Sequence, residues 1–146
     1  SVNGQVRSER VLNEALFCHA VPAATSNYIL QVGRMKEEQR SSGFWIGPAA
    51  GSTAAQRSAG GRVLPPTSKK LQLVVREPYS VEGHRYRLIR VEIPDGERAL
   101  VKSKMHRACL FLDGPYLAIQ VRLGDEVTFQ RSPQSLRVLG LQRRPR

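Results

Sequence analysis

The sequence has no hydrophobic run long enough to cross a bilayer and no apolar stretch of the kind that forms a signal-peptide core. We therefore expect a soluble, cytoplasmic protein with no membrane partner. Cysteine is also scarce, with Cys18 and Cys109 the only two in 146 residues, which argues against a disulfide-stapled secreted scaffold. Both lie in apolar, strand-like stretches, so we expect small buried hydrophobic residues there rather than a disulfide.

Aromatic residues make up only 6% of the chain, too few for an obvious row of base-stacking platforms. Acidic residues are outnumbered 12 to 23 by Lys and Arg, which gives a net charge of +11. A field of this sign attracts polyanions, and a nucleic-acid-binding β-domain is one interpretation. The basic residues are spread along the chain, so a small molecule carrying several phosphates fits equally well. We expect that small molecule, and no nucleic acid, as the partner.

Histidine is equally sparse, and the chain offers no metal-ligand spacing. His19, His84 and His106 are far apart in the sequence, and no Cys/His pattern of a zinc site accompanies them. We therefore expect no metal site and interpret these histidines as solvated or core residues.

Alternation of apolar and polar residues recurs through most of the chain and predicts strands. Turn signals at Val21–Ala24, Asp113-Gly114, Gly124-Asp125 and Ser132-Pro133 separate several of them. The predicted strands are Val11–Ala20, Tyr28–Met35, Leu71–Val75, Arg85–Ile93, Ala108–Leu112, Leu117–Leu123, Glu126–Gln130 and Leu136–Leu141.

One segment is typical of a helix: Ser52–Ala59 is rich in alanine, follows Gly51 and stops at Gly60-Gly61. Glu37–Ser42 and Arg62–Lys70 are polar or proline-rich and are predicted as connectors. The fold class is therefore all-β: a β-sandwich of many short strands with one short helix after a glycine-rich loop. We expect a domain over residues 1–141 and a basic tail over residues 142–146.

The stretch from Ser41 to Gly61 is the most informative part of the chain, because it is dominated by glycine, alanine and hydroxyl residues. Small residues let another group approach the backbone closely, and backbone N–H groups at a helix start favour an anion. The stretch could seat the ribose, amide or phosphate of a nucleotide, or it could be a tight turn that packs a helix onto a sheet. A Walker pattern is absent, because no Gly-Lys-Ser/Thr follows the glycines.

The order of residues in this stretch resembles the glycine-rich motif of the NAD kinase family. The resemblance rests on Gly51-Ser52-Thr53-Ala54 followed by Ser58-Ala59-Gly60-Gly61. Upstream, Leu12-Asn13-Glu14 is similar to the family's Asn-Glu motif. Downstream, Leu110–Gly114 and Leu123-Gly124-Asp125 are similar to its closing strands, so the resemblance runs from about Val11 to about Leu141.

The chain also departs from the commonest form of the motif. Pro48-Ala49-Ala50 stands where most members have Thr-Pro-Thr, Ala55 stands in place of a Tyr, and Ser42-Gly43 replaces Asp-Gly. These departures resemble the divergent plant-type branch that can prefer NADH. Neither the stacking of that Tyr nor the hydrogen bonds of that Asp carries over, so the preference between NAD and NADH stays open.

The resemblance implies the C-terminal, dinucleotide-binding domain of an enzyme that transfers a phosphoryl group from ATP, with Mg²⁺, to NAD(H). It implies binding residues at Asn13, Glu14, Gly51, Ser52, Thr53, Ala54 and Ser58. The family's catalytic Gly-Gly-Asp-Gly motif is absent, so we expect a fragment with no catalytic residue of its own, inactive alone. The resemblance further implies a homodimer or homotetramer. Polyphosphate stays open as the donor, and a domain of a sphingosine- or diacylglycerol-type lipid kinase stays open as an alternative of the same fold.

Several of these residues also have plainer interpretations. Asn13 and Glu14 could be a polar pair at a strand edge, and Asp113 is first of all a hairpin signal that could also reach the site. Trp45, beside Phe44, could be a core or interface aromatic or could stack on a base. The basic cluster at Lys102, Lys104, His106 and Arg107 could be a solvated strand edge or could attract phosphate.

Overall fold

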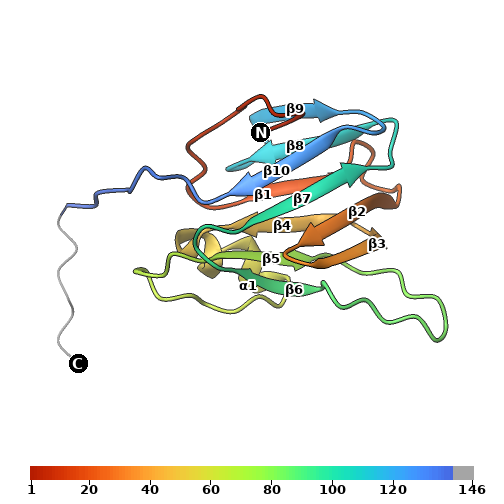
Figure 1. The fold of residues 1–146 in the computed structure, drawn as a ribbon, viewed down its shortest axis with the longest axis horizontal. Helices are drawn as coiled ribbons and strands as arrows, with labels where there is room; N and C mark the ends of the chain where they lie inside the picture. The colour runs from red at the N-terminus through yellow and green to blue at the C-terminus, as the bar shows by residue number, and fades with distance from the viewer. Residues whose placement is uncertain (140–146) are drawn as a thin grey trace.

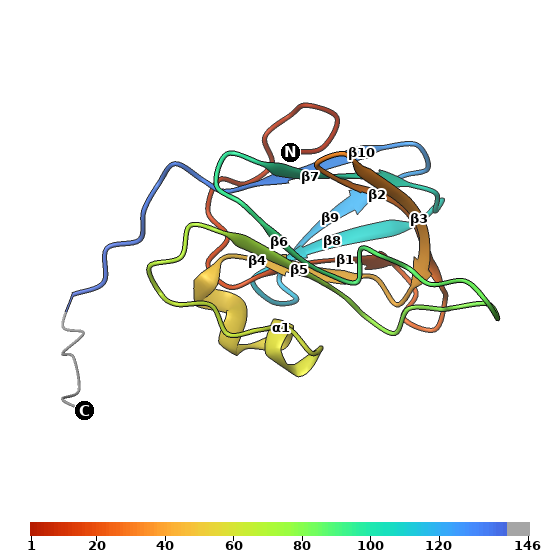
Figure 2. The same ribbon diagram turned by 60° about the horizontal axis from the view of Figure 1, so that its bottom comes forward.

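The computed structural model describes residues 1–139 as two antiparallel β-sheets packed face to face, with one helical segment outside them (Figures 1 and 2). This confirms the predicted all-β class. The six-stranded sheet has the order β6-β5-β4-β1-β8-β9 and the four-stranded sheet has the order β10-β7-β2-β3. The strands of the first sheet are β1 (Ala15–His19), β4 (Phe44–Gly47), β5 (Leu71–Val75), β6 (Arg90–Ile93), β8 (Ala108–Leu112) and β9 (Leu117–Val121). Those of the second are β2 (Ser26–Val32), β3 (Met35–Ser41), β7 (Arg98–Ser103) and β10 (Glu126–Gln130).

An aromatic cluster joins the two sheets at the centre of the core. Tyr28 from β2 packs edge-on against Phe17 from β1 and Phe44 from β4, with ring centroids 5.7 and 5.3 Å apart. The Tyr28 hydroxyl is fully buried and hydrogen-bonds to Gln39 Oε1 at 3.0 Å and to Ser41 Oγ at 2.8 Å. A buried hydroxyl is tolerated because it has partners, and burial strongly raises the pKa of Tyr28.

Strand β5 is buried on both faces. Leu71, Leu73 and Val75 belong to the core between the sheets, whereas Gln72 and Val74 face the helical segment. Figure 2 shows this segment on the outer side of the six-stranded sheet, away from β2, β3, β7 and β10. Because both faces of β5 are covered, its sequence is almost continuously apolar, and this pattern located the strand in the sequence.

The predicted helix Ser52–Ala59 is shorter and divided in two. A 3-10 turn η1 (Ala49–Thr53) is followed by a single helical turn α1 (Ala55–Ser58), and neither has a side-chain N-cap. Ala54 takes the N-cap position of α1, whereas Ser52 lies within η1 and its hydroxyl donates to the Ala49 carbonyl at 2.7 Å. The predicted stop is correct, since Gly60 has a φ of +92°, the left-handed conformation that glycine supplies at a helix end.

The prediction that Glu37–Ser42 is a connector is wrong, because β3 covers most of it and pairs with β2 along its whole length. β3 is an edge strand whose inward face carries Gln39 and Ser41, both bonded to Tyr28, so it has no apolar alternation to detect. The prediction of one strand over Tyr28–Met35 also failed at the turn, where Gly33 has a φ of +58°. Strand β7 was missed, although Ala99, Val101 and Ser103 alternate on its buried face.

Other predicted strands run past their observed ends. Residues 11–14 precede β1, residues 85–89 belong to the loop before β6, and residues 122–123 follow β9. Residues 136–139 form no strand, because Leu136, Val138 and Leu139 are 66%, 54% and 94% exposed and pair with no other strand among the described residues. Residues 140–141 and the expected basic tail at 142–146 lie outside the described residues. Leu71–Val75, Ala108–Leu112 and Glu126–Gln130 are confirmed at both ends.

Candidate functional site

The Asn-Glu segment and the glycine-rich turn lie against each other. β1 and β4 are antiparallel neighbours with Ala15 opposite Ile46, so the residues before β1 adjoin those after β4. A Cβ placed on Gly51 would lie 1.7 Å from the Asn13 carbonyl oxygen, and one on Gly47 would lie 2.2 Å from it. Glycine at both positions is therefore required by close backbone packing. The group that approaches these glycines is the Asn13 backbone.

Asp113 fixes the same segment from the other side. It follows β8, which pairs with β1, and its carboxylate accepts the backbone N–H groups of Leu12, Asn13 and Glu14 at 2.7, 2.7 and 3.2 Å. In return its own N–H donates to the Glu14 carbonyl at 3.0 Å. Asp113 has a φ of +50° and begins the β8–β9 turn, so it acts both as a turn residue and as a backbone acceptor at the candidate site.

The Glu14 side chain has an unsatisfied oxygen. Oε2 is buried and has no hydrogen-bond partner within the part of the chain that the structure describes. Burial, and secondly the neighbouring charge of Asp113, raise the pKa of Glu14. A buried acceptor without a donor is unfavourable, so this oxygen is suited to accept a hydrogen bond from a bound molecule.

The remaining predicted residues fall into two groups. Gly51 and Ser52 are buried, and the Ser52 hydroxyl is used internally, since it donates to Ala49 and accepts from the Leu64 N–H at 2.9 Å. The other group is exposed and is formed by Asn13, Thr53, Ala54 and Ser58. The Ser52 hydroxyl therefore serves the turn itself, whereas the side chains of the exposed group are open to solvent.

Two glutamines that were not predicted hold this arrangement together. Gln56 of α1 and Gln72 of β5 are fully buried and hydrogen-bond to each other at 3.0 Å. Gln56 Nε2 also donates to the Asn13 carbonyl at 3.4 Å, and Gln72 Oε1 accepts the Arg62 N–H at 2.7 Å. A glutamine inside the apolar run Leu71–Val75 was the available signal, because a polar side chain there needs a buried partner.

The surface is only shallowly hollowed in this structure. A depression of about 410 Å³ is lined by Arg62, Val63, Leu64, Pro65, Thr67, Ser68, Lys70 and Glu92. Another of about 320 Å³ lies by Gln31, Gly33, Gly96, Glu97, Arg98 and Leu100. Neither includes a predicted site residue, so we place the candidate site by its contacts and not by these depressions. Residues 1–139 contain no cluster of three or more His, Cys, Asp or Glu side chains suited to a metal ion.

The basic cluster is remote from this site. Arg107 precedes β8 and Asp113 follows it, so the length of the strand separates them by roughly 20 Å. Lys104 forms an ion pair with Glu38. Phe44 lies in the core, whereas Trp45 is half-buried on the outer face with the Arg76 guanidinium 5.6 Å from its ring centroid. Among the residues described, no helix is long and apolar enough to cross a membrane.

No family model matches the chain, but individual proteins do. It is 30% identical over 144 residues to a probable NADH kinase of Oryza sativa subsp. japonica, covering 94% of this chain and 44% of that protein. It is 37% identical over 99 residues to an NADH kinase of Arabidopsis thaliana, covering 68% and 31%. It is 29% identical over 136 residues to an NAD kinase of Rhodopirellula baltica, covering 92% and 42%. The chain thus spans less than half the length of these curated relatives.

The fold is also that of a solved structure. An NAD kinase from Archaeoglobus fulgidus, determined in complex with ATP, superposes with a TM-score of 0.73 at 22% sequence identity. The match covers 91% of this chain and 49% of the archaeal one. The chain is similar over most of its length to plant NADH kinases and to further NAD kinases, and it belongs to the NAD kinase family.

Proposed function

We propose that residues 1–141 bind NAD(H) for an enzyme that phosphorylates the 2′-hydroxyl of its adenosine ribose with ATP and forms NADP(H). The observation that carries the proposal is the unpaired, buried Oε2 of Glu14 beside the glycine-rich turn. A ribose hydroxyl or a base N–H is a donor of the kind this oxygen lacks.

Within the proposed complex, the side chains have distinct tasks. Glu14 accepts from the dinucleotide, and the exposed amide of Asn13 can both donate and accept. Thr53 and Ser58 contribute hydroxyls, and the small side chain of Ala54 lets the dinucleotide approach the protein backbone. Gly51 and Ser52 keep the turn against Asn13 and make no contact through a free side chain.

The contribution of this chain to the reaction is positional. In-line phosphoryl transfer depends on holding the attacking hydroxyl in place, on Mg²⁺, which neutralises the phosphates of ATP, and on a base. The family's Gly-Gly-Asp-Gly motif, whose Asp would be that base, does not occur in these 146 residues. We therefore propose that the chain binds dinucleotide but does not transfer phosphate by itself.

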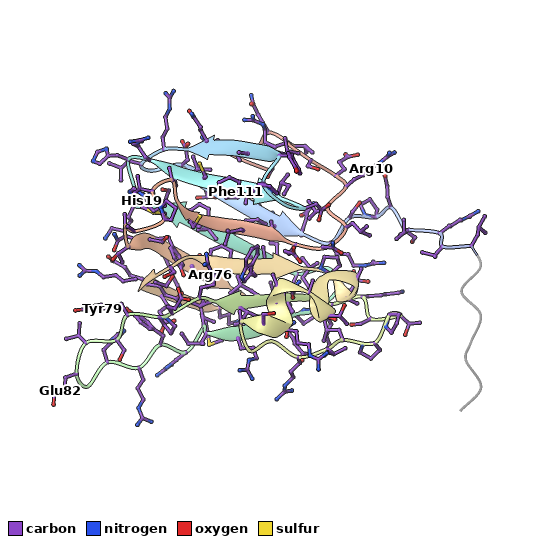
Figure 3. All side chains as sticks on the ribbon, turned by 180° about the vertical axis from the view of Figure 1, so that it is seen from behind. Arg10, His19, Arg76, Tyr79, Glu82 and Phe111 are labelled. Carbon is purple, nitrogen blue, oxygen red and sulfur yellow. The ribbon has the colours of Figure 1, made fainter. Side chains whose placement is uncertain are left out.

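We further propose that the protein acts in the cytoplasm as a homodimer or homotetramer, with no nucleic acid partner. A row of half-buried apolar side chains supports self-association: Trp45, Leu16 and Phe111 are directly opposite one another on β4, β1 and β8. Figure 3 shows Phe111 on this outer face of the six-stranded sheet. The charge of +11 suits a dinucleotide, which brings its own phosphates.

Calorimetric titration of the chain with NAD and with NADH tests the proposal. Asn13→Ala combined with Glu14→Ala should weaken binding by about 2–4 kcal/mol, the loss of two hydrogen bonds with polar or charged partners. Glu82→Ala, on the loop that Figure 3 shows projecting from the sheets, is the control and should bind as the natural chain does. Equal affinity of the double variant and the natural chain would remove Asn13 and Glu14 from the site.

Two further measurements separate the alternatives. A dinucleotide releases few counterions, so its affinity should fall only slightly with salt, whereas duplex DNA binding should weaken steeply. The purified chain with ATP, Mg²⁺ and NAD(H) should form no NADP(H). Measurable product from the chain alone would contradict the assignment of the catalytic base to another segment.

A further inference from the structure

The two cysteines are direct cross-strand partners, which the sequence did not indicate. Cys18 of β1 lies opposite Cys109 of β8 in the antiparallel register. Their neighbours Phe17 and Leu110 belong to the core, so the cysteines point to the outer face of the six-stranded sheet. Both thiols are free, and both cysteines are half-buried rather than buried as expected.

The backbone spacing of this pair lies within the range of a disulfide. The Ala20 N–H donates to the Arg107 carbonyl at 2.9 Å, and the Asp113 N–H donates to the Glu14 carbonyl at 3.0 Å. In an antiparallel pair of strands, hydrogen-bonded and non-hydrogen-bonded residue pairs alternate. Cys18 is two residues from Ala20 and four from Glu14, so Cys18 and Cys109 also form a hydrogen-bonded pair. Such partners have Cα atoms about 5.5 Å apart, inside the roughly 4.4–6.8 Å of disulfides. Their Cβ atoms are also about 5.5 Å apart, beyond the usual 3.5–4.5 Å, so closure must draw the two strands together and leaves a strained, easily reduced bond.

The surroundings leave the pair accessible to a reagent. Gly43 adjoins Cys18 on the β4 side, where a Cβ would lie 2.7 Å from the Cys18 Cβ, so no side chain covers the thiol there. Burial raises the pKa of both thiols, while the charge of Arg76 opposes this at Cys18 and that of Arg107 opposes it at Cys109. The pKa values of both thiols stay raised overall, so the thiolate that attacks a disulfide becomes available as the pH is raised.

We propose that Cys18 and Cys109 form a redox-active dithiol that closes to an intramolecular disulfide when it meets a small-molecule disulfide such as oxidised glutathione. One thiolate attacks a sulfur of the glutathione disulfide, whose S–S bond breaks and releases one glutathione thiolate. The second cysteine then attacks the protein sulfur of the mixed disulfide and releases the other glutathione. The protein loses two electrons, and its two thiol protons end on the two glutathione molecules.

Closure would act on the strands that carry the candidate site. Cys18 follows Glu14 along β1, and Cys109 precedes Asp113 along β8. The new bond would therefore cross-link the strands whose ends hold Asp113 against the Asn13–Glu14 backbone. The dithiol itself goes beyond the proposed function and does not depend on it.

The experiment uses the full chain in dilute solution with oxidised glutathione, followed by intact-mass measurement and non-reducing peptide mapping. The natural chain should lose two hydrogens, retain no glutathione and yield a single peptide linking Cys18 to Cys109. Its melting temperature should rise by less than about 10 °C, because strain offsets part of the loop-closure gain, and should return to the starting value on reduction. Absence of reaction, glutathione retained on both cysteines, or links between chains would each overturn the proposal.

A matched control keeps two thiols on the same face but separates them. Gln120 of β9 lies opposite Cys109, so Cys109→Ser with Gln120→Cys places the second thiol one strand farther from Cys18. Two strand spacings amount to roughly 9.6 Å, beyond the reach of a disulfide. This variant should retain glutathione on both thiols. Closure as readily as in the natural chain would show that the register has no part in the reaction.

A second probe does not depend on that variant folding. The trivalent arsenical phenylarsine oxide bridges two neighbouring thiols, so the natural chain should bind it on the order of a hundredfold more tightly than Cys18→Ala does. Equal binding by the two proteins would mean that Cys18 and Cys109 do not act as a pair.

Discussion

The Asp113 carboxylate holds the Asn13 backbone in place: its Oδ1 accepts the Asn13 N–H at 2.7 Å across the junction of β1 and β8. The same oxygen accepts from Glu14, and Oδ2 accepts from Leu12. One side chain thus satisfies three consecutive N–H groups ahead of β1. These donors have no strand partner to take its place, because β1 begins only at Ala15.

Asp113→Asn tests this relationship without disturbing the turn, since asparagine also tolerates the φ of +50°. The amide replaces one of the two accepting oxygens with an NH2 group, so it loses either the bond from Leu12 or those from Asn13 and Glu14. We expect the free energy of unfolding in urea to fall by about 1–2 kcal/mol and NAD(H) binding to weaken. Asp95→Asn removes an exposed ion pair with Arg131 and should cost less than about 0.5 kcal/mol. Equal losses in the two variants would count against a special role for Asp113.

Gly51→Ala should be among the most damaging small substitutions in the chain. The new Cβ would lie 1.7 Å from the Asn13 carbonyl oxygen, and neither backbone can yield without moving β1 or η1. We expect a loss of roughly 3 kcal/mol or more in the free energy of unfolding. Gly83→Ala is the control, because a Cβ there meets nothing within 4 Å and carries only the strain of a positive φ, about 1–2 kcal/mol. A Gly51→Ala variant no less stable than this control would disprove the close approach.

Ionisation of Glu37 should make the free energy of unfolding depend on pH. Burial by itself raises its pKa, but hydrogen bonds from the N–H groups of Arg87 and Leu88 and from the Gln39 side chain lower the pKa of Glu37 overall. A carboxyl with a lowered pKa stabilises the fold above its unfolded pKa and loses this effect as the pH falls through the folded value.

The stability difference between the natural chain and Glu37→Gln should therefore be largest near neutral pH and should shrink between about pH 5 and pH 3. Thermal unfolding across this range measures it. Glu92 and Asp125 also have lowered pKa values and remain in both proteins, so their contributions cancel in the difference. A difference that does not change with pH would mean that the ionised form of Glu37 is not the stabilising one.

Self-association is checked by light scattering at physiological salt. Screening over about 8 Å limits the repulsion that the charge of +11 generates, so the natural chain should be a dimer or tetramer at micromolar concentration. Phe111→Glu places a charge in the row formed with Leu16 and Trp45 and should give a monomer. Val81→Glu, on the loop between β5 and β6, should leave the assembly unchanged. A natural chain that is strictly monomeric would mean that any site is built from one copy alone.

The strands that the sequence predicted well are those whose apolar residues are buried, on one face as in β8 or on both faces as in β5. Leu71–Val75 and Ala108–Leu112 were located at both ends, because their apolar residues face a core. β3 could not be found in this way, since its inward residues Gln39 and Ser41 serve Tyr28 and the pattern reads as polar throughout. β7 could have been found, since Ala99 and Val101 do alternate with polar neighbours.

The candidate site shows the same division. The motifs at Asn13–Glu14 and Gly51–Ala54 were recognisable in the sequence, but their contact depends on β1 and β4 being neighbours, which no local pattern contains. The Ser52 hydroxyl accepts a hydrogen bond from the N–H of Leu64, which lies beyond a loop and is not a neighbour in the sequence. For the same reason Cys18 and Cys109 gave no sign of being partners, because their pairing is set by the strand order of the sheet.

The contact between Gly51 and Asn13 sets the shape of the candidate site without the use of side chains. It is made by backbone atoms, and Asp113 likewise binds backbone N–H groups, so neither contact depends on which side chain Asn13 carries. The exposed side chains at Asn13, Thr53, Ala54 and Ser58 can therefore be exchanged while the turn keeps its shape. For the proposed dinucleotide site, substitutions at these positions should therefore change ligand affinity with little change in the free energy of unfolding.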